Sequence, residues 1–71
     1  MVELKNRVKQ LRWLNGEMTQ QELADRLGVT RQTILAIEKG KFNPSTRLAL
    51  QMAQIFKTSV EAIFYLEGDG S

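Results

Sequence analysis

Residues 19–40 read TQQELADRLGVTRQTILAIEKG, and this stretch decides the fold. Thr19 and Glu22 have the spacing of a capping box, in which the threonine caps a backbone N–H of a new helix and the glutamate bonds back to the threonine. Gly28 follows at the point where the chain must leave that helix with a positive φ, which glycine adopts at least cost. Thr30 is a second N-cap. The stretch therefore predicts two short helices joined by a tight turn.

The apolar residues of this stretch fit two helices that cross at a steep angle. Ala24 is the small residue that lets the two backbones approach, and it lies shortly before Gly28. Gly40 ends the second helix. The residues expected to face inward are Leu23, Leu27, Val29, Ile34 and Ile37. Each feature alone is common in ordinary helix packing, but the whole set with both caps predicts a helix-turn-helix.

Three further helices are expected around this motif, which makes the fold class an all-α, five-helix domain. The first is expected from about Leu4 to Asn15, because apolar residues recur there at helical spacing. Those residues are Leu4, Val8, Leu11 and Leu14. Trp13 lies off this stripe, and we expect its ring at the edge of the core, with a subunit contact as the alternative.

The remaining helices begin at serine N-caps, Ser45 for the fourth and Ser59 for the fifth. Their core-facing residues are Leu48, Met52, Ile55 and Phe56 in the fourth helix and Val60, Ile63 and Phe64 in the fifth. A short strand pair between Met1-Val2-Glu3 and Tyr65-Leu66-Glu67 is left open. We expect one domain over residues 1–67 and a disordered tail over residues 68–71, which has nothing to bury.

Composition excludes several classes of function. The chain has 71 residues without cysteine or histidine, so disulfides, thiolate nucleophiles, imidazole bases and the usual zinc ligands are excluded. The sequence has neither paired carboxylates nor a glycine-rich phosphate loop that would indicate an enzyme. We expect no cofactor and no metal. No segment approaches the ~20 apolar residues of a membrane span. We expect a protein of the cytoplasm, without a membrane association and without a separate small-molecule effector domain.

Charge alternates along the chain. The formal charge is +3 over residues 1–16, −2 over 17–27, +3 over 28–47 and −2 over the remainder. A protein with one phosphate-facing surface would show such alternation, because phosphate contacts need Lys and Arg on one side only. Solvated helix faces produce a similar pattern, so charge alone does not decide between the two interpretations.

The motif residues resemble the XRE family of phage-repressor and Cro-like domains. The likeness runs from about Asn6 to Phe64, includes the Asn43-Pro44-Ser45 segment after the motif, and is closest to short stand-alone repressors of the cytolysin-regulator type. It implies a lambda-repressor-like fold whose third helix enters the major groove, in a homodimer on a palindromic operator. The connection from Arg12 to Gln20 is one residue longer than the commonest family pattern.

Within this resemblance, individual residues acquire expected roles. Those expected to read base edges are Arg31, Gln32 and Leu35, with a solvated helix face as the alternative. Those expected to contact phosphates are Gln20, Thr30, Thr33, Lys39, Lys41, Asn43 and Ser45, with capping or solvation as the alternative. The resemblance also implies a structural ion pair between Arg12 and Glu38 that joins the first helix to the third.

Two functions are therefore carried forward. The first is a transcriptional regulator, a repressor that occupies double-stranded operator DNA as a homodimer. We expect the two subunits to contact each other through the fifth helix and Phe64-Tyr65-Leu66. The second is an antitoxin-like protein-interaction module that masks a partner protein and binds DNA secondarily.

Overall fold

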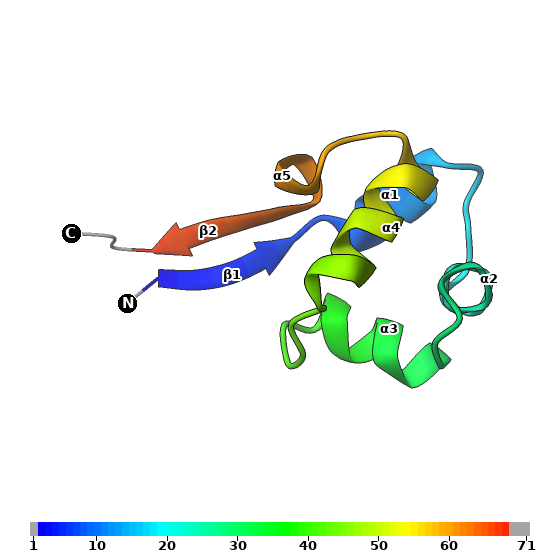
Figure 1. Ribbon diagram of the computed structural model, residues 1–71, viewed down its shortest axis with the longest axis horizontal. Coiled ribbons are helices and arrows are strands. Elements are labelled where there is room, and N and C mark those ends of the chain that lie inside the picture. The colour runs from blue at the N-terminus through cyan, green and yellow to red at the C-terminus, as the bar shows by residue number, and fades with distance from the viewer. Residues whose placement is uncertain (1, 69–71) are drawn as a thin grey trace.

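The computed structural model describes residues 2–68, which form a bundle of helices with a two-stranded ribbon projecting from it (Figure 1). The elements in chain order are β1 (Val2–Asn6), α1 (Val8–Leu14), α2 (Gln20–Leu27), α3 (Arg31–Glu38), α4 (Thr46–Phe56), α5 (Val60–Ile63) and β2 (Phe64–Gly68). The five expected helices are confirmed, and the strand pair that had been left open is present.

Local hydrogen bonds set the ends of α2 and the start of α3 as the sequence predicts. The Thr19 side chain accepts from the Glu22 N–H, and the Glu22 carboxylate accepts from the Thr19 N–H, so the capping box is complete. Gly28 has a φ of 71°, and the next amide, of Val29, donates back to the Ala24 carbonyl. Thr30 accepts from the Thr33 N–H and caps α3. The turn between the two helices is therefore as tight as expected.

The core lies where all five helices converge. α2 packs against α3 through the inward residues predicted from the motif, of which Val29 alone is partly exposed. The buried apolar side chains are Val8, Met18, Leu23, Ala24, Leu27, Ile34, Ile37, Leu48, Ala49, Met52, Ala53, Phe56 and Ile63. Met18 was not predicted; it lies in the α1–α2 connection, outside any periodic pattern. This core fixes the orientation of α3.

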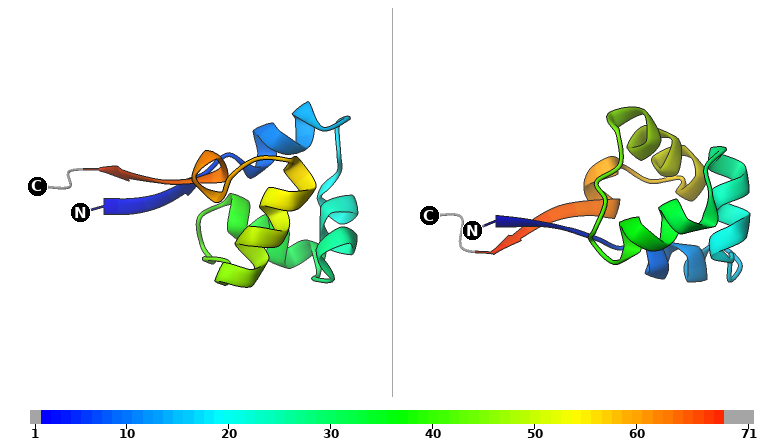
Figure 2. Two further views of the ribbon diagram at one scale, coloured as in Figure 1. Left: turned by 45° about the horizontal axis from the view of Figure 1, so that its top comes forward. Right: turned by 90° about the horizontal axis from the view of Figure 1, so that it is seen from below.

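The first helix begins later than predicted. Leu4, expected inside it, lies in β1 and pairs with Leu66 of β2 in an antiparallel register. The prediction was wrong because Val2 and Leu4 alternate with Glu3 and Lys5, a period of two that suits a strand as well as Leu4 suits a helical stripe. Figures 1 and 2 show the ribbon extending away from the helices in every view.

The end of α1 also departs from prediction. Leu14 is 80% exposed and Trp13 is 57% exposed, so neither belongs to the core. Both side chains line an open hollow with Lys9 and Gln10 on the outer face of α1. Leu14 is the last residue of the helix, where the stripe has already turned away from the neighbouring helices.

The C-terminal boundary shifts slightly. Gly68, placed in the expected tail, is the last residue of β2, while residues 69–71 and Met1 lie outside the described residues. Among the helices that are described, none is long and apolar enough to cross a membrane.

Candidate nucleic-acid interface

The first two turns of α3 present a mixed surface to solvent. Arg31 and Gln32 are exposed, and Leu35 one turn later is 38% exposed. Ile34 and Ile37 on the opposite side are buried. The three residues expected to read bases therefore share the outward face of α3. Ala36 is half-buried beside them and offers one methyl group.

A chain of side-chain hydrogen bonds runs inward from this face. The Arg31 Nε donates to the Gln20 Oε1 at 3.4 Å, and the Gln20 Nε2 donates to the Glu38 Oε1 at 3.2 Å. Gln20 was expected to contact phosphate; the structure adds that its amide joins the start of α2 to both ends of α3. No sequence pattern indicates this link, because the partners lie on separate helices.

The ion pair between Arg12 and Glu38 is present and buried. Arg12 Nε lies 2.6 Å from Glu38 Oε2, a second guanidinium nitrogen donates to Oε1 at 3.1 Å, and the third donates to the Met18 carbonyl at 2.7 Å. Side-chain exposure is about 10% for both partners. One guanidinium thus ties α1, the α1–α2 connection and the end of α3 together.

The starts of α3 and α4 offer backbone N–H groups that could bind an anion. Thr30 and Thr33 lie at its start, with their hydroxyl oxygens 3.1 Å apart. Ser45 accepts from the Leu48 N–H at the start of α4, where the remaining N–H groups of the first turn have no helical partner. Such ends favour anions through free donors and the helix dipole. Capping accounts for part of the hydrogen bonding of Thr30 and Ser45, whereas the Thr33 hydroxyl bonds to that of Thr30.

The segment after α3 carries the remaining candidate phosphate contacts. Lys39, Lys41 and Asn43 are all exposed. The backbone turns there through Gly40, whose φ is 74°, and the Lys41 N–H donates to the Ala36 carbonyl. Within residues 2–68 the ion pairs are Lys5–Glu3 and Arg12–Glu38. In that part of the chain Lys39 and Lys41 consequently have no carboxylate within ion-pair distance.

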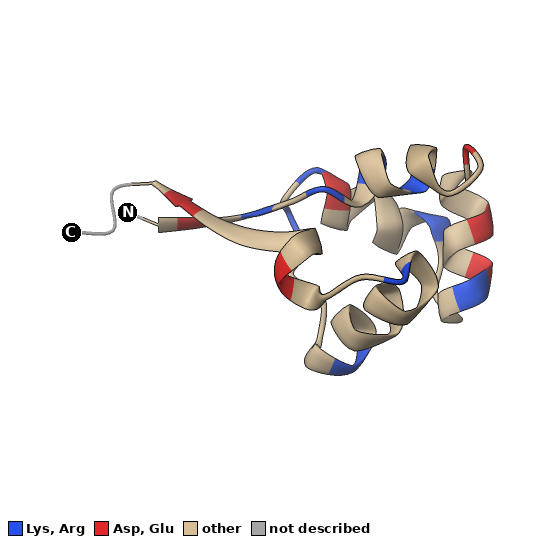
Figure 3. Cartoon of the chain, turned by 90° about the horizontal axis from the view of Figure 1, so that it is seen from above, with Lys and Arg blue, Asp and Glu red and all other residues tan. Residues whose placement is uncertain are grey.

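Charged residues of both signs lie on the ribbon and on the helical part of the molecule. Figure 3 shows Asp and Glu beside Lys or Arg on the ribbon, on α2 and on α3. The ribbon contributes its own pair, Lys5 with Glu3 at 3.2 Å, and this hydrogen bond raises the pKa of Lys5. The ribbon therefore has charged groups of its own, apart from Lys39 and Lys41 after α3.

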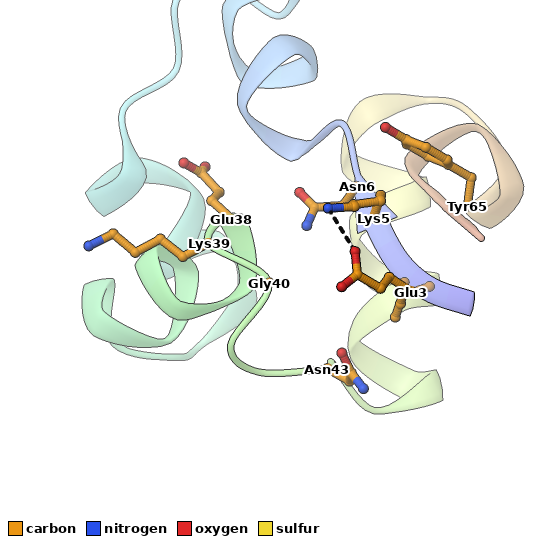
Figure 4. A pocket seen from close by; sticks show the side chains of 9 residues that line it. Glu3, Lys5, Asn6, Glu38, Lys39, Gly40, Asn43 and Tyr65 are labelled. Carbon is orange, nitrogen blue, oxygen red and sulfur yellow. Dashed lines mark ion pairs between the residues drawn. The ribbon is translucent and has the colours of Figure 1, made fainter. Parts of the chain in front are cut away.

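A polar hollow of about 430 Å³ lies between the base of the ribbon and the end of α3 (Figure 4). Its lining includes Asn6, Glu38, Lys39, Asn43 and Tyr65. Among the described residues, no group of three or more Asp or Glu side chains is arranged to hold a metal ion. The hollow therefore lies between the ribbon and the α3 surface.

Comparison with known proteins now decides the family. A family model described as helix-turn-helix matches residues 8–63, which is most of the chain. The chain belongs to the XRE-type helix-turn-helix family. Its matched region begins with α1 and ends with α5, so the ribbon lies outside the family core. Since a helix-turn-helix is a DNA-binding motif, this XRE-family protein is a DNA-binding regulator by family.

Two relatives resemble the XRE-family protein over nearly their whole length. One is an uncharacterized HTH-type transcriptional regulator, MJ0272, of Methanocaldococcus jannaschii, 50% identical over 93% of this chain and 98% of the relative. The other is an uncharacterized HTH-type transcriptional regulator, YgzD, of Bacillus subtilis, 47% identical over 90% of this chain and 96% of the relative. The similarity therefore covers the ribbon strands in part as well as the helices.

Proposed function

We propose that this XRE-family protein is a sequence-specific repressor that occupies operator DNA as a homodimer. The observation that carries the proposal is the outward face of α3, where Arg31, Gln32 and Leu35 are exposed together at the start of the recognition helix. Repression follows from occupancy, because a bound operator excludes other proteins from the same DNA. The protein acts in the cytoplasm, where the operator is.

Base reading by these side chains has a definite chemistry. An arginine donates two hydrogen bonds to the O6 and N7 of guanine, and a glutamine pairs with the N6 and N7 of adenine. Leu35, one turn further on, packs against a thymine methyl. Gln20 holds the Arg31 side chain before DNA arrives, which reduces the entropy lost when the arginine pairs with its base.

Phosphate contacts fix the position of α3 in the groove. The helix starts at Gln20, Thr30 and Ser45 supply backbone donors, and the segment after α3 supplies Lys39, Lys41 and Asn43. Thr33 adds a hydroxyl group beside Thr30. These groups bind every sequence alike, so they provide affinity rather than specificity.

The homodimer is supported by an apolar surface on the opposite side of the ribbon from its charged residues. Leu4 and Phe64 line a groove of about 260 Å³ with Leu50 of α4, and Leu66, the cross-strand partner of Leu4, is 71% exposed. An isolated two-stranded ribbon is marginally stable in water. A second copy related by a two-fold axis would cover the exposed apolar side chains of the ribbon.

Two recognition helices related by a two-fold axis read a palindrome, with half-sites about 34 Å apart on one face of the duplex. Selection of duplexes from a random pool tests the proposal directly. We expect an enriched palindrome whose half-sites are separated by one helical turn, bound more weakly as salt increases. Enrichment of unrelated sequences by wild-type protein would contradict sequence-specific repression.

A second candidate is an antitoxin-like module that binds a partner protein. The exposed Trp13 and Leu14 on α1 favour it, since side chains of this size at the surface often mark protein contacts. Stable capture of one partner protein by a chain that shows no specific duplex binding would support this function over the first.

A further inference from the structure

Asn6 lies where the ribbon, α1 and α3 meet. It is the last residue of β1 and pairs with Phe64, the first residue of β2. Its side-chain Nδ2 donates to the Ile37 carbonyl at 2.9 Å, and its Oδ1 accepts from the Val8 N–H at 3.2 Å. One amide therefore contacts the last turn of α3 and the first turn of α1 while its backbone belongs to the ribbon.

The bond to Ile37 differs from the other hydrogen bonds at the end of α3. The carbonyls of Leu35, Ala36 and Ile37 already accept from Lys39, Lys41 and Gly40, and these are local bonds that end the helix. Asn6 adds a bond across 31 positions of sequence to the same Ile37 oxygen. Local bonds end α3 but do not orient it relative to the ribbon, whereas the Asn6 amide does.

Apolar contacts at this junction are less directional. Val8, Ile37 and Ile63 are fully buried there. Because the hydrophobic effect is non-directional, their burial brings the elements together but restrains the angle between them less than a hydrogen bond does. A hydrogen bond weakens steeply when its angle departs from linearity. Figure 4 shows Asn6 projecting from β1 toward the end of α3, at the edge of the polar hollow.

We infer that Asn6 is a positioning residue that sets the angle between the ribbon and the recognition helix. This inference rests on the proposed homodimer, because two copies that meet through their ribbons hold their α3 helices at a separation set by that angle. Asn6 touches neither DNA nor the second copy. Asn6 therefore affects how well a dimer binds two half-sites simultaneously. The binding of one copy to a single half-site does not depend on Asn6.

Two variants separate the bond to α3 from the bond to α1. In Asn6→Ser the hydroxyl oxygen accepts from the Val8 N–H, but the serine side chain is too short to reach the Ile37 carbonyl. In Asn6→Asp the carboxylate keeps the bond to Val8 and has no proton to donate to Ile37. Asn15→Ser is the matched control, since the Asn15 Nδ2 also donates to a backbone carbonyl, of Leu11 at 2.8 Å, but within α1.

The test uses full-length protein and duplexes that carry the selected half-site either once or twice, with the separation changed one base pair at a time. Wild type and Asn15→Ser should show one sharp optimum of separation. Asn6→Ser and Asn6→Asp should keep single half-site affinity within about twofold and lose about tenfold at the optimum, as expected for one hydrogen bond lost per protomer. Urea unfolding and sedimentation of each variant verify that it is folded and measure its assembly.

The other results overturn the inference in different ways. An unchanged separation profile for Asn6→Ser would show that the apolar junction alone sets the angle. Equal losses on single and paired half-sites would show that Asn6 only supports α3 within one copy. A wild-type protein with no preferred separation would contradict the proposed homodimer itself, and the inference with it.

Discussion

Gln20 donates to Glu38 at 3.2 Å, and this bond connects the start of α2 to the buried ion pair beneath α3. The same Gln20 side chain accepts from Arg31. The recognition face is therefore held from inside the protein, because the group that orients Arg31 is itself fixed by Glu38.

Gln20→Ala should weaken specific binding by a few fold and reduce discrimination at the base that we propose Arg31 reads, since the arginine then samples more rotamers before it binds. Gln21→Ala is the control, because the Gln21 amide bonds only to Asp25 within α2. Fluorescence anisotropy with the selected duplex and its single-base variants measures both effects. Equal behaviour of the two variants would contradict the role of Gln20.

Glu38→Ala should lower the free energy of unfolding by about 3–5 kcal/mol, because it leaves the buried Arg12 without its charge partner. The double variant Arg12→Met/Glu38→Met should lose less than Glu38→Ala alone, since no unpaired charge then remains in the core. Urea unfolding followed by circular dichroism gives both values. A double variant that loses as much as Glu38→Ala, or more, would contradict an unpaired buried charge as the cause of the loss.

Arg31→Ala should weaken the free energy of binding to the selected duplex by about 1–3 kcal/mol and relax specificity at one position of each half-site.

Lys41→Ala should weaken binding to all duplexes alike and reduce the slope of affinity against salt by about one counterion. Titrations of both variants at several salt concentrations distinguish the sequence-specific loss in Arg31→Ala from the uniform loss in Lys41→Ala. Uniform losses on every sequence from Arg31→Ala would exclude it from base reading.

Leu66→Lys should dissociate the proposed homodimer, because it places a charge on the apolar face of the ribbon beside Leu4. Leu14→Lys makes the same chemical change at the exposed end of α1 and should leave the dimer intact. Analytical ultracentrifugation at micromolar concentration reads the result. Dissociation by Leu14→Lys alone would place the subunit contact on α1 instead.

Gly28→Ala should lower the free energy of unfolding by about 1–2 kcal/mol, the cost of a left-handed non-glycine residue. A methyl group at Gly28 would meet no heavy atom within 4 Å, so the backbone alone accounts for the loss. Lys57→Gly tests the opposite change, in which a left-handed residue becomes glycine and the free energy of unfolding should rise. Lys57 has a φ of 56° at the end of α4, and glycine there should stabilise by up to about 1 kcal/mol.

The helix-turn-helix could be predicted in detail because its determinants are local. Thr19, Glu22, Gly28 and Thr30 each act on residues within one turn of themselves, so their spacing in the sequence is their spacing in the structure. The inward apolar positions follow from helical periodicity in the same way. The ion pair of Arg12 with Glu38 joins distant segments and was expected only through the family resemblance.

Features that depend on tertiary contact were predicted less well. Leu4 was assigned to α1 because its spacing from Val8 is helical, and only pairing with Leu66 places it in a strand. Leu14 fits the same stripe but has no neighbouring helix to bury it. The two bonds of Gln20 and the bond of Asn6 to Ile37 join residues whose proximity depends on how the helices pack.

The ribbon also has a consequence for the order in which the protein matures. Its register pairs Val2 with Gly68, so β1 leaves the ribosome first but has no partner until β2 has been synthesised. The helix-turn-helix, whose contacts are close in sequence, can form before that loop is closed. In a growing chain, a surface that reads DNA would therefore precede the surface through which two copies would meet.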